Sequence, residues 1–218
     1  MGVSLETIVL WAVPVVFAIT LHEAAHGYVA KLFGDRTAEM LGRISLNPLK
    51  HIDPIGTLLV PGVLLTLAWI NKSPPFVFGW AKPVPVNFGN LRDPRRDMIW
   101  VAAAGPGSNF LQALLWALIL VATAPGGFVP SPGLFEMADI GFKVNLVLMA
   151  LNLLPLPPLD GGRVLAGLLP ARAAAGLARI EPFGLFIILA LLATGFLNDL
   201  MRPLVRAAAN LIARIVGL

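Results

Sequence analysis

The sequence predicts an all-α polytopic membrane protein, and three observations support this fold class. Of the 218 residues, 57% are hydrophobic and only 13% are charged, whereas about a quarter of the residues in a soluble domain are charged. The charges cluster in short stretches and leave long apolar runs between them. A helix needs about 20 apolar residues to cross the hydrocarbon core of a bilayer, and several of these runs reach or approach that length.

We expect about five transmembrane segments, an extended membrane-reentrant segment and a C-terminal amphipathic helix, all in a single domain over residues 1–218. The transmembrane segments are expected at 5–33, 54–70, 98–123, 138–155 and 183–198. The reentrant segment is expected at 76–90 and the amphipathic tail at 201–218.

The composition excludes several classes of protein. Without cysteine the chain has no disulfide, no cysteine nucleophile and no thiolate zinc site. Residues 1–6 contain no Lys or Arg, so the first apolar run lacks the basic start of a secretory signal peptide and should stay in the protein. The 16 Lys and Arg residues fall in short stretches between apolar runs, as in membrane proteins that fix their orientation by charge. We therefore expect no nucleic-acid partner.

The first segment, 5–33, ends at Gly34, a common helix-stop residue. The connection that follows is the densest basic loop in the first half of the chain, with Lys31, Arg36, Arg43 and Lys50. Basic loops lie on the cytoplasmic side, which predicts an external N-terminus.

The reentrant segment resolves a conflict in the charge pattern. If the segment 54–70 crosses the membrane from the cytoplasmic to the external side, the next basic residues, Arg92, Arg95 and Arg96, would be external. This would contradict the positive-inside rule, by which basic loops lie in the cytoplasm. Residues 76–90 are too rich in Pro and Gly for a helix but alternate with a period of two, which favours an extended strand or loop that dips back into the protein. Irregular backbone at membrane depth is tolerated where it lines a wet cavity. The alternative is a long surface loop that breaks the charge rule.

Proline and glycine mark the remaining segments. Pro61 should kink the segment 54–70, and Pro106 should kink 98–123, which opens with the small-residue stretch AAAGPGSNF. The segment 138–155 leads into NLLPLPPLDGG. The tail 201–218 carries three arginines at near-helical spacing among aliphatic residues, which predicts a helix lying in the membrane interface.

The strongest chemical motif is His22-Glu23-Ala24-Ala25-His26 in the first segment. This HExxH spacing puts two imidazoles on one helical face, where they can share one Zn²⁺, while Glu23 can act as general base. The alternative is that these side chains only hydrogen-bond to neighbouring helices. Ionisable residues inside an apolar helix are costly and usually functional, which favours metal binding.

A catalytic zinc needs a third protein ligand. Asp160 stands out because it follows an almost wholly apolar, proline-rich run and precedes two glycines that permit close backbone approach. It could instead be the N-cap of the helix that follows. The other candidate ligands lie beside basic residues or at expected interfaces: Glu39, His51, Asp53, Glu136, Asp139 and Glu181. For His51 and Asp53 we expect a structural or lid role.

Three stretches, HEAAHGYVAKLFGD, AAAGPGSNF and NLLPLPPLDGGRV, together resemble the site-2 protease family of intramembrane zinc metalloproteases. The resemblance spans roughly residues 15–168, and this chain is expected to be a compact form that departs from many relatives in lacking PDZ and CBS domains. It implies that His22, His26 and Asp160 bind zinc, that Glu23 is catalytic, and that Asn152 binds the substrate backbone or the oxyanion. The segment 76–90 is similar in position to a reentrant segment of that family.

Two kinds of residue beyond the motif have less specific expected roles. We expect Asn109 to line a polar cavity with the motif residues, although a single Asn among small residues is more often a link between helices. An extended backbone at Val84 and Val86 could pair with an unwound substrate strand.

The expected function is zinc-dependent hydrolysis of peptide bonds within or near transmembrane segments of other membrane proteins. The expected location is a prokaryotic cell membrane, with the active site nearer the cytoplasmic side, and the oligomeric state is open. Two alternatives remain: a metal-binding transporter or non-catalytic regulatory module, which would not need Glu23, and a prenyl-protein-type membrane protease, whose third ligand would be a Glu.

Overall fold

The computed structural model describes residues 5–70, 72 and 79–217, and over these residues it is helical without a β-strand. The long helices are α1 (Leu5–Leu32), α3 (Val60–Ile70), α4 (Pro94–Thr123), α5 (Pro132–Asn152), α8 (Gly184–Ala193) and α9 (Phe196–Val216). Shorter helices are α2 (Thr37–Met40), η1 (Pro48–His51), η2 (Pro54–Leu59), η3 (Phe88–Asn90), α6 (Asp160–Leu168), α7 (Ala171–Ala178) and η4 (Glu181–Phe183).

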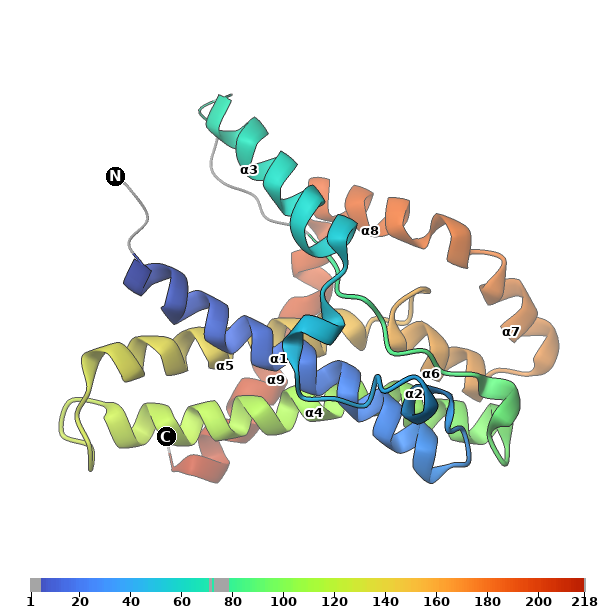
Figure 1. Ribbon diagram of the computed structural model, residues 1–218, viewed down its shortest axis with the longest axis horizontal. Helices are drawn as coiled ribbons and strands as arrows, with labels where there is room; N and C mark the ends of the chain where they lie inside the picture. Colours follow the sequence, from blue (N-terminus) through green and yellow to red (C-terminus); the bar gives the residue numbers. More distant parts are fainter. Residues whose placement is uncertain (1–4, 71, 73–78, 218) are drawn as a thin grey trace.

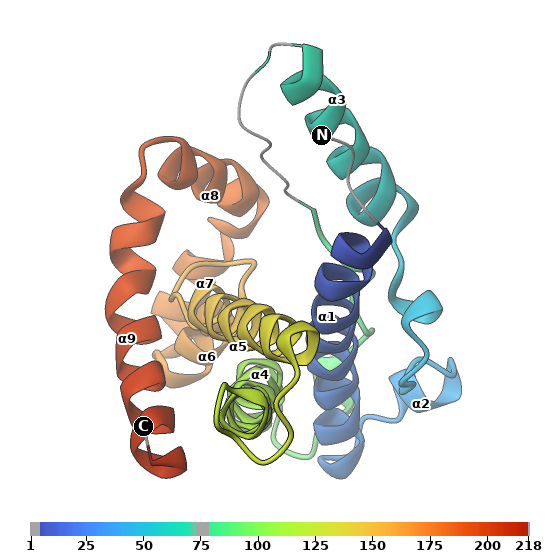
Figure 2. The same cartoon turned by 90° about the vertical axis from the view of Figure 1, so that its left-hand side faces the viewer.

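Helices α4 and α5 form the centre of the molecule, and α1 packs against both (Figure 1). In Figure 2 the central pair is seen end-on, with α1 on one side and α9 on the other. The core between α4, α5 and α9 contains Ala113, Ala117, Leu146, Met149, Ala208 and Ile212. The alanines of this core, on α4 and α9, allow close backbone approach, which is typical of membrane helix packing.

Three helical runs in the described part of the chain are long and apolar enough to cross a membrane: Leu5–Leu32, Pro94–Thr123 and Ala171–Ala193. The third combines α7, η4 and α8 and begins earlier than the predicted 183–198. A shorter apolar run covers Pro54–Ala68. Helix α5 begins at Pro132, six residues before the predicted 138, because Ser131-Pro132 starts the helix and Pro is favoured in a first turn.

The C-terminal helix differs from its prediction. Helix α9 begins at Phe196, directly after Gly195, whose φ of +78° ends the preceding helical run. It is amphipathic, but its apolar face packs on protein, since Ile212 is fully buried in the core with α4 and α5. The predicted amphipathic helix is therefore present, but it begins at Phe196 rather than at 201, and part of its apolar face belongs to the core of the protein. Leu218, at its end, lies outside the described residues.

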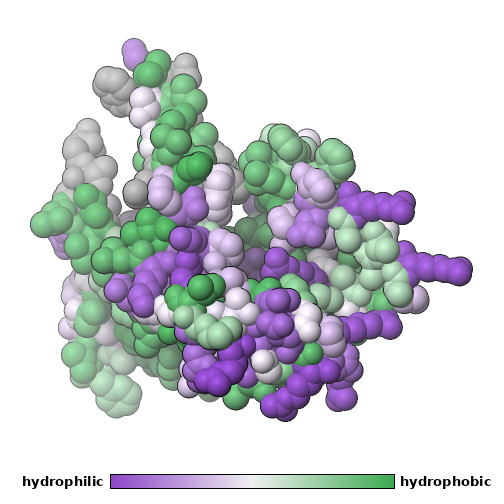
Figure 3. All heavy atoms as spheres, turned by 45° about the vertical axis from the view of Figure 1, so that its right-hand side comes forward, coloured by the Kyte–Doolittle hydropathy of each residue, from purple (hydrophilic) through white to green (hydrophobic). Residues whose placement is uncertain are grey.

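The basic loops meet at one end of the molecule. The backbone N–H of Arg92 donates to the carbonyl of Phe33 over 3.0 Å, so the start of α4 lies beside the end of α1. The Arg95 guanidinium donates to the carbonyls of Gly167 and Leu169, which brings α6 to the same end. In Figure 3 hydrophilic residues gather over the lower and right-hand parts of the molecule, while α3 at the top is hydrophobic. Arg92 and its neighbours thus share one end with the first basic loop.

The chain reaches that end by leaving the body along α3 and returning through residues 79–90 (Figures 1 and 2). The π-helix η2 precedes α3, so the irregular turn lies before Pro61 rather than at it. Residues 79–87 are extended but form no strand. The Trp80 N–H donates to the Gly56 carbonyl and the Lys82 N–H to that of His51. Residues 76–78 of the expected reentrant segment lie outside the described residues.

Candidate metal centre

His22, His26 and Asp160 meet in the interior, although α1 carries the two histidines and Asp160 is the first residue of α6. The two Nε2 atoms lie 3.1 Å apart. Oδ2 of Asp160 lies 3.2 Å from His22 Nε2 and 3.3 Å from His26 Nε2. All three side chains are buried. Three donor atoms thus point at one shared position.

These donors fit a single zinc ion. With Zn–N and Zn–O bonds of about 2.0–2.1 Å, neighbouring ligands of a tetrahedral ion lie about 3.3 Å apart, close to the observed separations. Asp160 Oδ2 is buried and has no hydrogen-bond partner among the described residues, and a buried unpaired acceptor is costly. A bound cation would satisfy it.

Helix α4 leaves room on the ligand side of the histidines. A Cβ at position 105 would lie 2.4 Å from His26 Nε2 and 2.5 Å from His22 Nε2, which is closer than any non-bonded contact. Gly105 therefore keeps open the space in front of both ligand atoms.

The other ring nitrogens fix how each histidine faces the site. His26 Nδ1 lies 2.7 Å from the Val101 carbonyl oxygen, and His22 Nδ1 lies 2.6 Å from Asn109 Oδ1. Both oxygens can only accept, so each Nδ1 carries the proton and each Nε2 keeps its lone pair for a metal. Metal-ligating histidines usually have such a partner.

The position of Asn109 differs from the prediction that it lines a polar cavity. Two pockets adjoin His22 and Glu23, and Asn109 lines neither of them, because its side chain is fully buried. Because α4 packs against α1, its side chain reaches α1 instead, with Oδ1 2.6 Å from His22 Nδ1 and Nδ2 3.2 Å from the Ala18 carbonyl oxygen.

The turn before α6 delivers Asp160. Leu159 is the N-cap residue and Asp160 is the first residue inside α6, so the N-cap alternative is wrong. A Cβ on Gly161 would lie 2.4 Å from the carbonyl oxygens of Leu153 and Leu154. Glycine thus lets the turn fold tightly against the end of α5, and Asp160 then points at α1.

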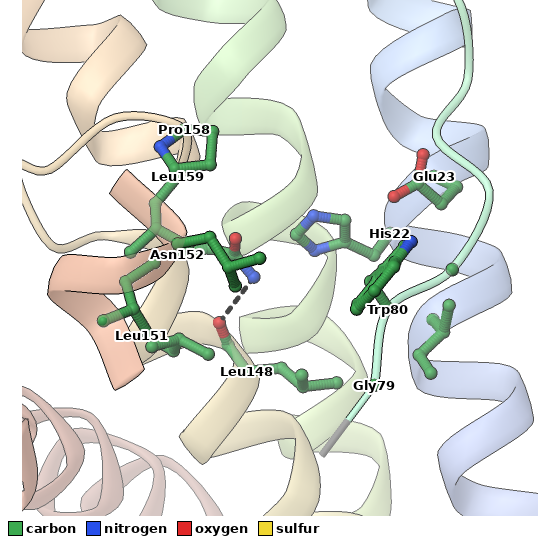
Figure 4. A pocket seen from close by; sticks show the side chains of 13 residues that line it. His22, Glu23, Gly79, Trp80, Leu148, Leu151, Asn152, Pro158 and Leu159 are labelled. Carbon is green, nitrogen blue, oxygen red and sulfur yellow. Dashed lines mark hydrogen bonds between the residues drawn. The ribbon is translucent and has the colours of Figure 1, made fainter. Parts of the chain in front are cut away.

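Glu23 lies beside the three donors in a pocket between α1, α5, α8 and residues 79–81. Figure 4 shows His22 and Asn152 facing one another across it. Glu23 Oε2 accepts a hydrogen bond from the Val84 N–H over 2.7 Å. Asn152 Nδ2 donates to the Leu148 carbonyl over 3.0 Å. Apart from these three polar residues, the lining is mostly apolar and includes Ile19, Leu148, Leu151, Leu159, Leu185 and Ile188.

Val84 and Val86 line a second pocket at the site, which His22, Glu23 and Asp160 also line, and their side chains pack against the protein as well. Val84 is buried, and a Cβ on Gly27 of α1 would come within 3.0 Å of its Cγ1. Val86 packs against the cluster of Ala30, Leu91 and Val101. Both side chains thus form part of the wall of that pocket while packing against the protein.

The other candidate ligands have different partners. Glu39 pairs with Lys31 and Arg36, and Asp139 pairs with Lys143. His51 is buried against the Ser45 carbonyl, and Asp53 accepts from the backbone of Ile55 and Gly56. The hydrogen bonds of the last two are local, and their expected structural or lid role stays a prediction.

Comparison with known proteins identifies the family. The model of peptidase family M50 matches residues 127–195. The chain is 37% identical over 207 residues, or 93% of its length and 89% of the relative, to the Bacillus subtilis protein named "Putative zinc metalloprotease YwhC". The chain belongs to peptidase family M50, the site-2 protease family. This confirms the resemblance seen in its motifs.

A second M50 relative is the Mycolicibacterium smegmatis protein named "Putative zinc metalloprotease Rip2", 30% identical over 90% of this chain and 70% of the relative. A protein of Methanocaldococcus jannaschii, "Putative zinc metalloprotease MJ0611", is 37% identical over 30% of this chain and 31% of the relative. No solved structure matches. This M50 chain is a metalloprotease, and its cofactor is zinc.

Some site residues of this M50 chain, such as Val101 and Gly105, were missed from sequence alone, whereas Asn109 was expected at the site in a different role. Val101, Gly105 and Asn109 follow one another at intervals of four on one face of α4 and supply a carbonyl, an empty space and an amide. The spacing was present in VAAAGPGSNF, but small residues in an apolar helix more often indicate helix packing. Asn145, which contacts Asn109, had no such signal.

Proposed function

We propose that this metalloprotease cuts peptide bonds within or near transmembrane segments of other membrane proteins. One observation carries the proposal: the cluster of His22, His26 and Asp160 lies beside Glu23 at a mostly apolar pocket, and two of the helices that line it, α1 and α8, belong to helical runs apolar enough to cross a membrane. A hydrophilic substrate would gain little from such surroundings, whereas an apolar segment would bury its side chains there.

In this proposal His22, His26 and Asp160 hold the zinc through Nε2, Nε2 and Oδ2. When bound, zinc supplies Lewis-acid polarisation of the scissile carbonyl and makes water a nucleophile at neutral pH. Glu23 takes a proton from the attacking water and passes it to the leaving amine, so that the amide C–N bond breaks into a carboxylate and an amine. Its place in the pocket wall beside His22 supports this role.

Asn152 is proposed to bind the substrate backbone or the oxyanion. Its Nδ2 carries two hydrogens, and the bond to the Leu148 carbonyl uses one of them. It faces His22 across the pocket (Figure 4), which supports donation to a substrate carbonyl at that position.

The substrate must be locally unwound, because a helix satisfies its own amides. The extended residues 79–86 line the pocket with Gly79, Trp80 and Ala81. We propose that the backbone of this segment pairs with the unwound substrate strand, which gives affinity with little dependence on side chains.

We propose a multi-pass arrangement in the plasma membrane with about five crossings: α1, the η2–α3 run, α4, α5 and the α7–α8 run. The end that gathers Arg92, Arg95 and the loop after α1 would be cytoplasmic by the charge rule. Residues 79–90 would then return through the membrane region, and the metal centre would lie nearer the cytoplasmic side.

The alternative is a metal carrier or non-catalytic module, and the discriminating residue is Glu23. Purified Glu23→Gln protein should keep its zinc, measured by metal analysis, and should not cleave a library of transmembrane-helix peptides in proteoliposomes. Asp160→Ala should lose both zinc and cleavage. Glu6→Gln, at the exposed start of the same helix, is the matched control and should keep both. Full cleavage by Glu23→Gln would refute the proposed mechanism.

A further inference from the structure

We propose that Asn109 and Asn145 form a positioning pair that holds the proton of His22 on Nδ1, so that Nε2 stays available for zinc. The inference rests on the proposed function, because it assigns a role to residues behind the same metal centre. Neither asparagine touches the substrate pocket, so both act through His22.

The pair forms a continuous hydrogen-bonded chain across three helices. Asn109 on α4 accepts from His22 on α1 through Oδ1, at 2.6 Å. Its Nδ2 donates to Oδ1 of Asn145 on α5 at 2.9 Å and to the Ala18 carbonyl at 3.2 Å. Asn145 Nδ2 donates in turn to the Gly141 carbonyl at 2.9 Å.

The direction of this chain is fixed from its far end. The Gly141 carbonyl can only accept, so Asn145 must turn its Nδ2 toward it and its Oδ1 toward Asn109. Asn109 then faces two acceptors, Asn145 Oδ1 and the Ala18 carbonyl, and must present Nδ2 to them. Its Oδ1 is left for His22, which must donate from Nδ1.

A reversed Asn109 amide shows why the second asparagine matters. Reversal would direct Asn109 Nδ2 at His22 Nδ1 and would favour the His22 tautomer whose proton is on Nε2. That tautomer cannot bind a metal through Nε2. The same reversal would set Asn109 Oδ1 against two other acceptors. Asn145 therefore prevents the arrangement that would block metal binding.

Burial raises the energetic difference between the two arrangements. Asn109 and Asn145 are both 0% exposed, so water cannot repair a mismatched contact. A buried polar group without a partner costs about 1–3 kcal/mol. His26 needs no such pair, because its Nδ1 faces the Val101 backbone carbonyl, which cannot reverse.

The test is zinc affinity, measured by competition with a chelator. Asn109→Leu should weaken zinc binding by about 10–100-fold, as other partners of metal-ligating histidines do. Gln112→Leu is the matched control: Gln112 lies one turn further along α4, is buried, and donates to the same Ala18 carbonyl over 3.4 Å, so that its hydrogen bond runs to the backbone of α1 and not to His22. It should bind zinc as the unsubstituted protein does. Equal affinity in Asn109→Leu would overturn the proposal.

A second measurement separates positioning from general packing. The chain has three histidines, so side-chain ¹⁵N NMR of the metal-free protein can assign the tautomer of His22. We expect the proton on Nδ1 in the unsubstituted protein and a shift of population toward Nε2 in Asn145→Leu, which leaves His22 and Asn109 themselves intact and remains a test if Asn109→Leu fails to fold. An unchanged tautomer in Asn145→Leu would overturn the role of that residue.

Failure of the inference and failure of the proposed function give different results. If the unsubstituted protein cleaves transmembrane peptides and Asn109→Leu binds zinc equally well, the positioning pair is wrong and the protease stands. If the unsubstituted protein binds zinc with the predicted Asn109 dependence but never cleaves, the pair stands and the protease proposal fails.

Discussion

The backbone N–H of Val84 donates a hydrogen bond of 2.7 Å to Oε2 of Glu23. The proposed general base is therefore tied to the extended segment that returns from α3, far away in sequence. That segment is also held by Arg43, whose guanidinium donates to the carbonyls of Lys82 and Pro83 at 3.0 and 3.3 Å. A shift of this segment would move the Val84 N–H, which donates the hydrogen bond to Glu23.

Loss of the Arg43 contact should slow cleavage without removing zinc. Hydrogen bonds from charged groups contribute about 1.5–3 kcal/mol to the stability of the contacts that they form. If part of this free energy holds the segment in its active position, Arg43→Leu should lower kcat/KM by about tenfold. Cleavage rates and metal content of the purified protein measure the two effects. Arg36→Leu, which removes an arginine of the same loop that pairs with Glu39, is the control. Unchanged cleavage in Arg43→Leu would show that the segment needs no such anchor.

The elements that depend on local sequence were predictable. Helix α1 ends one residue from its predicted boundary, because its long apolar run and Gly34 are local signals. The meeting of His22, His26 and Asp160 was also predicted, since the HExxH spacing fixes the first two on one face. The unusual setting of Asp160 among apolar residues indicated the third.

The elements that depend on tertiary contacts were not predictable from one sequence. An amphipathic sequence pattern such as that of α9 is the same whether the apolar face packs on lipid or on protein. Here Ile212 on that face packs in the core with α4 and α5. The amide of Asn109 could have faced a cavity or a helix, and only the packing of α1 against α4 decides between them. Likewise, periodicity alone could not show that Val84 would turn its side chain toward Gly27.

Gly105 should be essential for zinc binding. An alanine Cβ there would lie 2.4–2.6 Å from atoms of both histidine rings, so the rings would have to move and would no longer share a metal. We expect Gly105→Ala to lose zinc and activity together, measured by metal analysis and peptide cleavage. Gly107→Ala is the control on the same helix, because a Cβ there meets nothing within 4 Å. Zinc retained at full occupancy in Gly105→Ala would contradict the proposed ligand set.

Gly161 should control the position of Asp160. A Cβ at Gly161 would lie 2.4 Å from two backbone carbonyl oxygens, and backbone cannot move aside as a flexible side chain can. Gly161→Ala should therefore displace the turn and weaken zinc binding by tenfold or more, on the scale of about 10–100-fold seen when ligand support is lost. Chelator competition measures this, with Gly176→Ala, where a Cβ meets nothing within 4 Å, as control. Equal affinity in both variants would mean that the turn can relax.

Asp35 should make stability depend on pH. It is fully buried just after α1 and accepts hydrogen bonds from the backbone and hydroxyl of Thr37, the backbone of Asn87 and the side chain of Asn90. Burial by itself raises the pKa of this carboxyl, but these hydrogen bonds outweigh burial and lower the pKa below its ordinary value. The folded state thus favours the ionised form.

A lowered pKa in the folded state contributes stability above the unfolded value of about 3.9, and this contribution is lost as pH falls through the folded pKa. Asp35→Asn should therefore lower the thermal unfolding midpoint in detergent at pH 7, by the equivalent of about 1–3 kcal/mol. The gap between the two proteins should narrow below about pH 4. Asp199→Asn, at an exposed ion pair with Arg202, should change stability by less than about 0.5 kcal/mol. A gap for Asp35→Asn that stays constant down to pH 3 would show that the ionised carboxylate is not what anchors Asn87 and Asn90 to the end of α1.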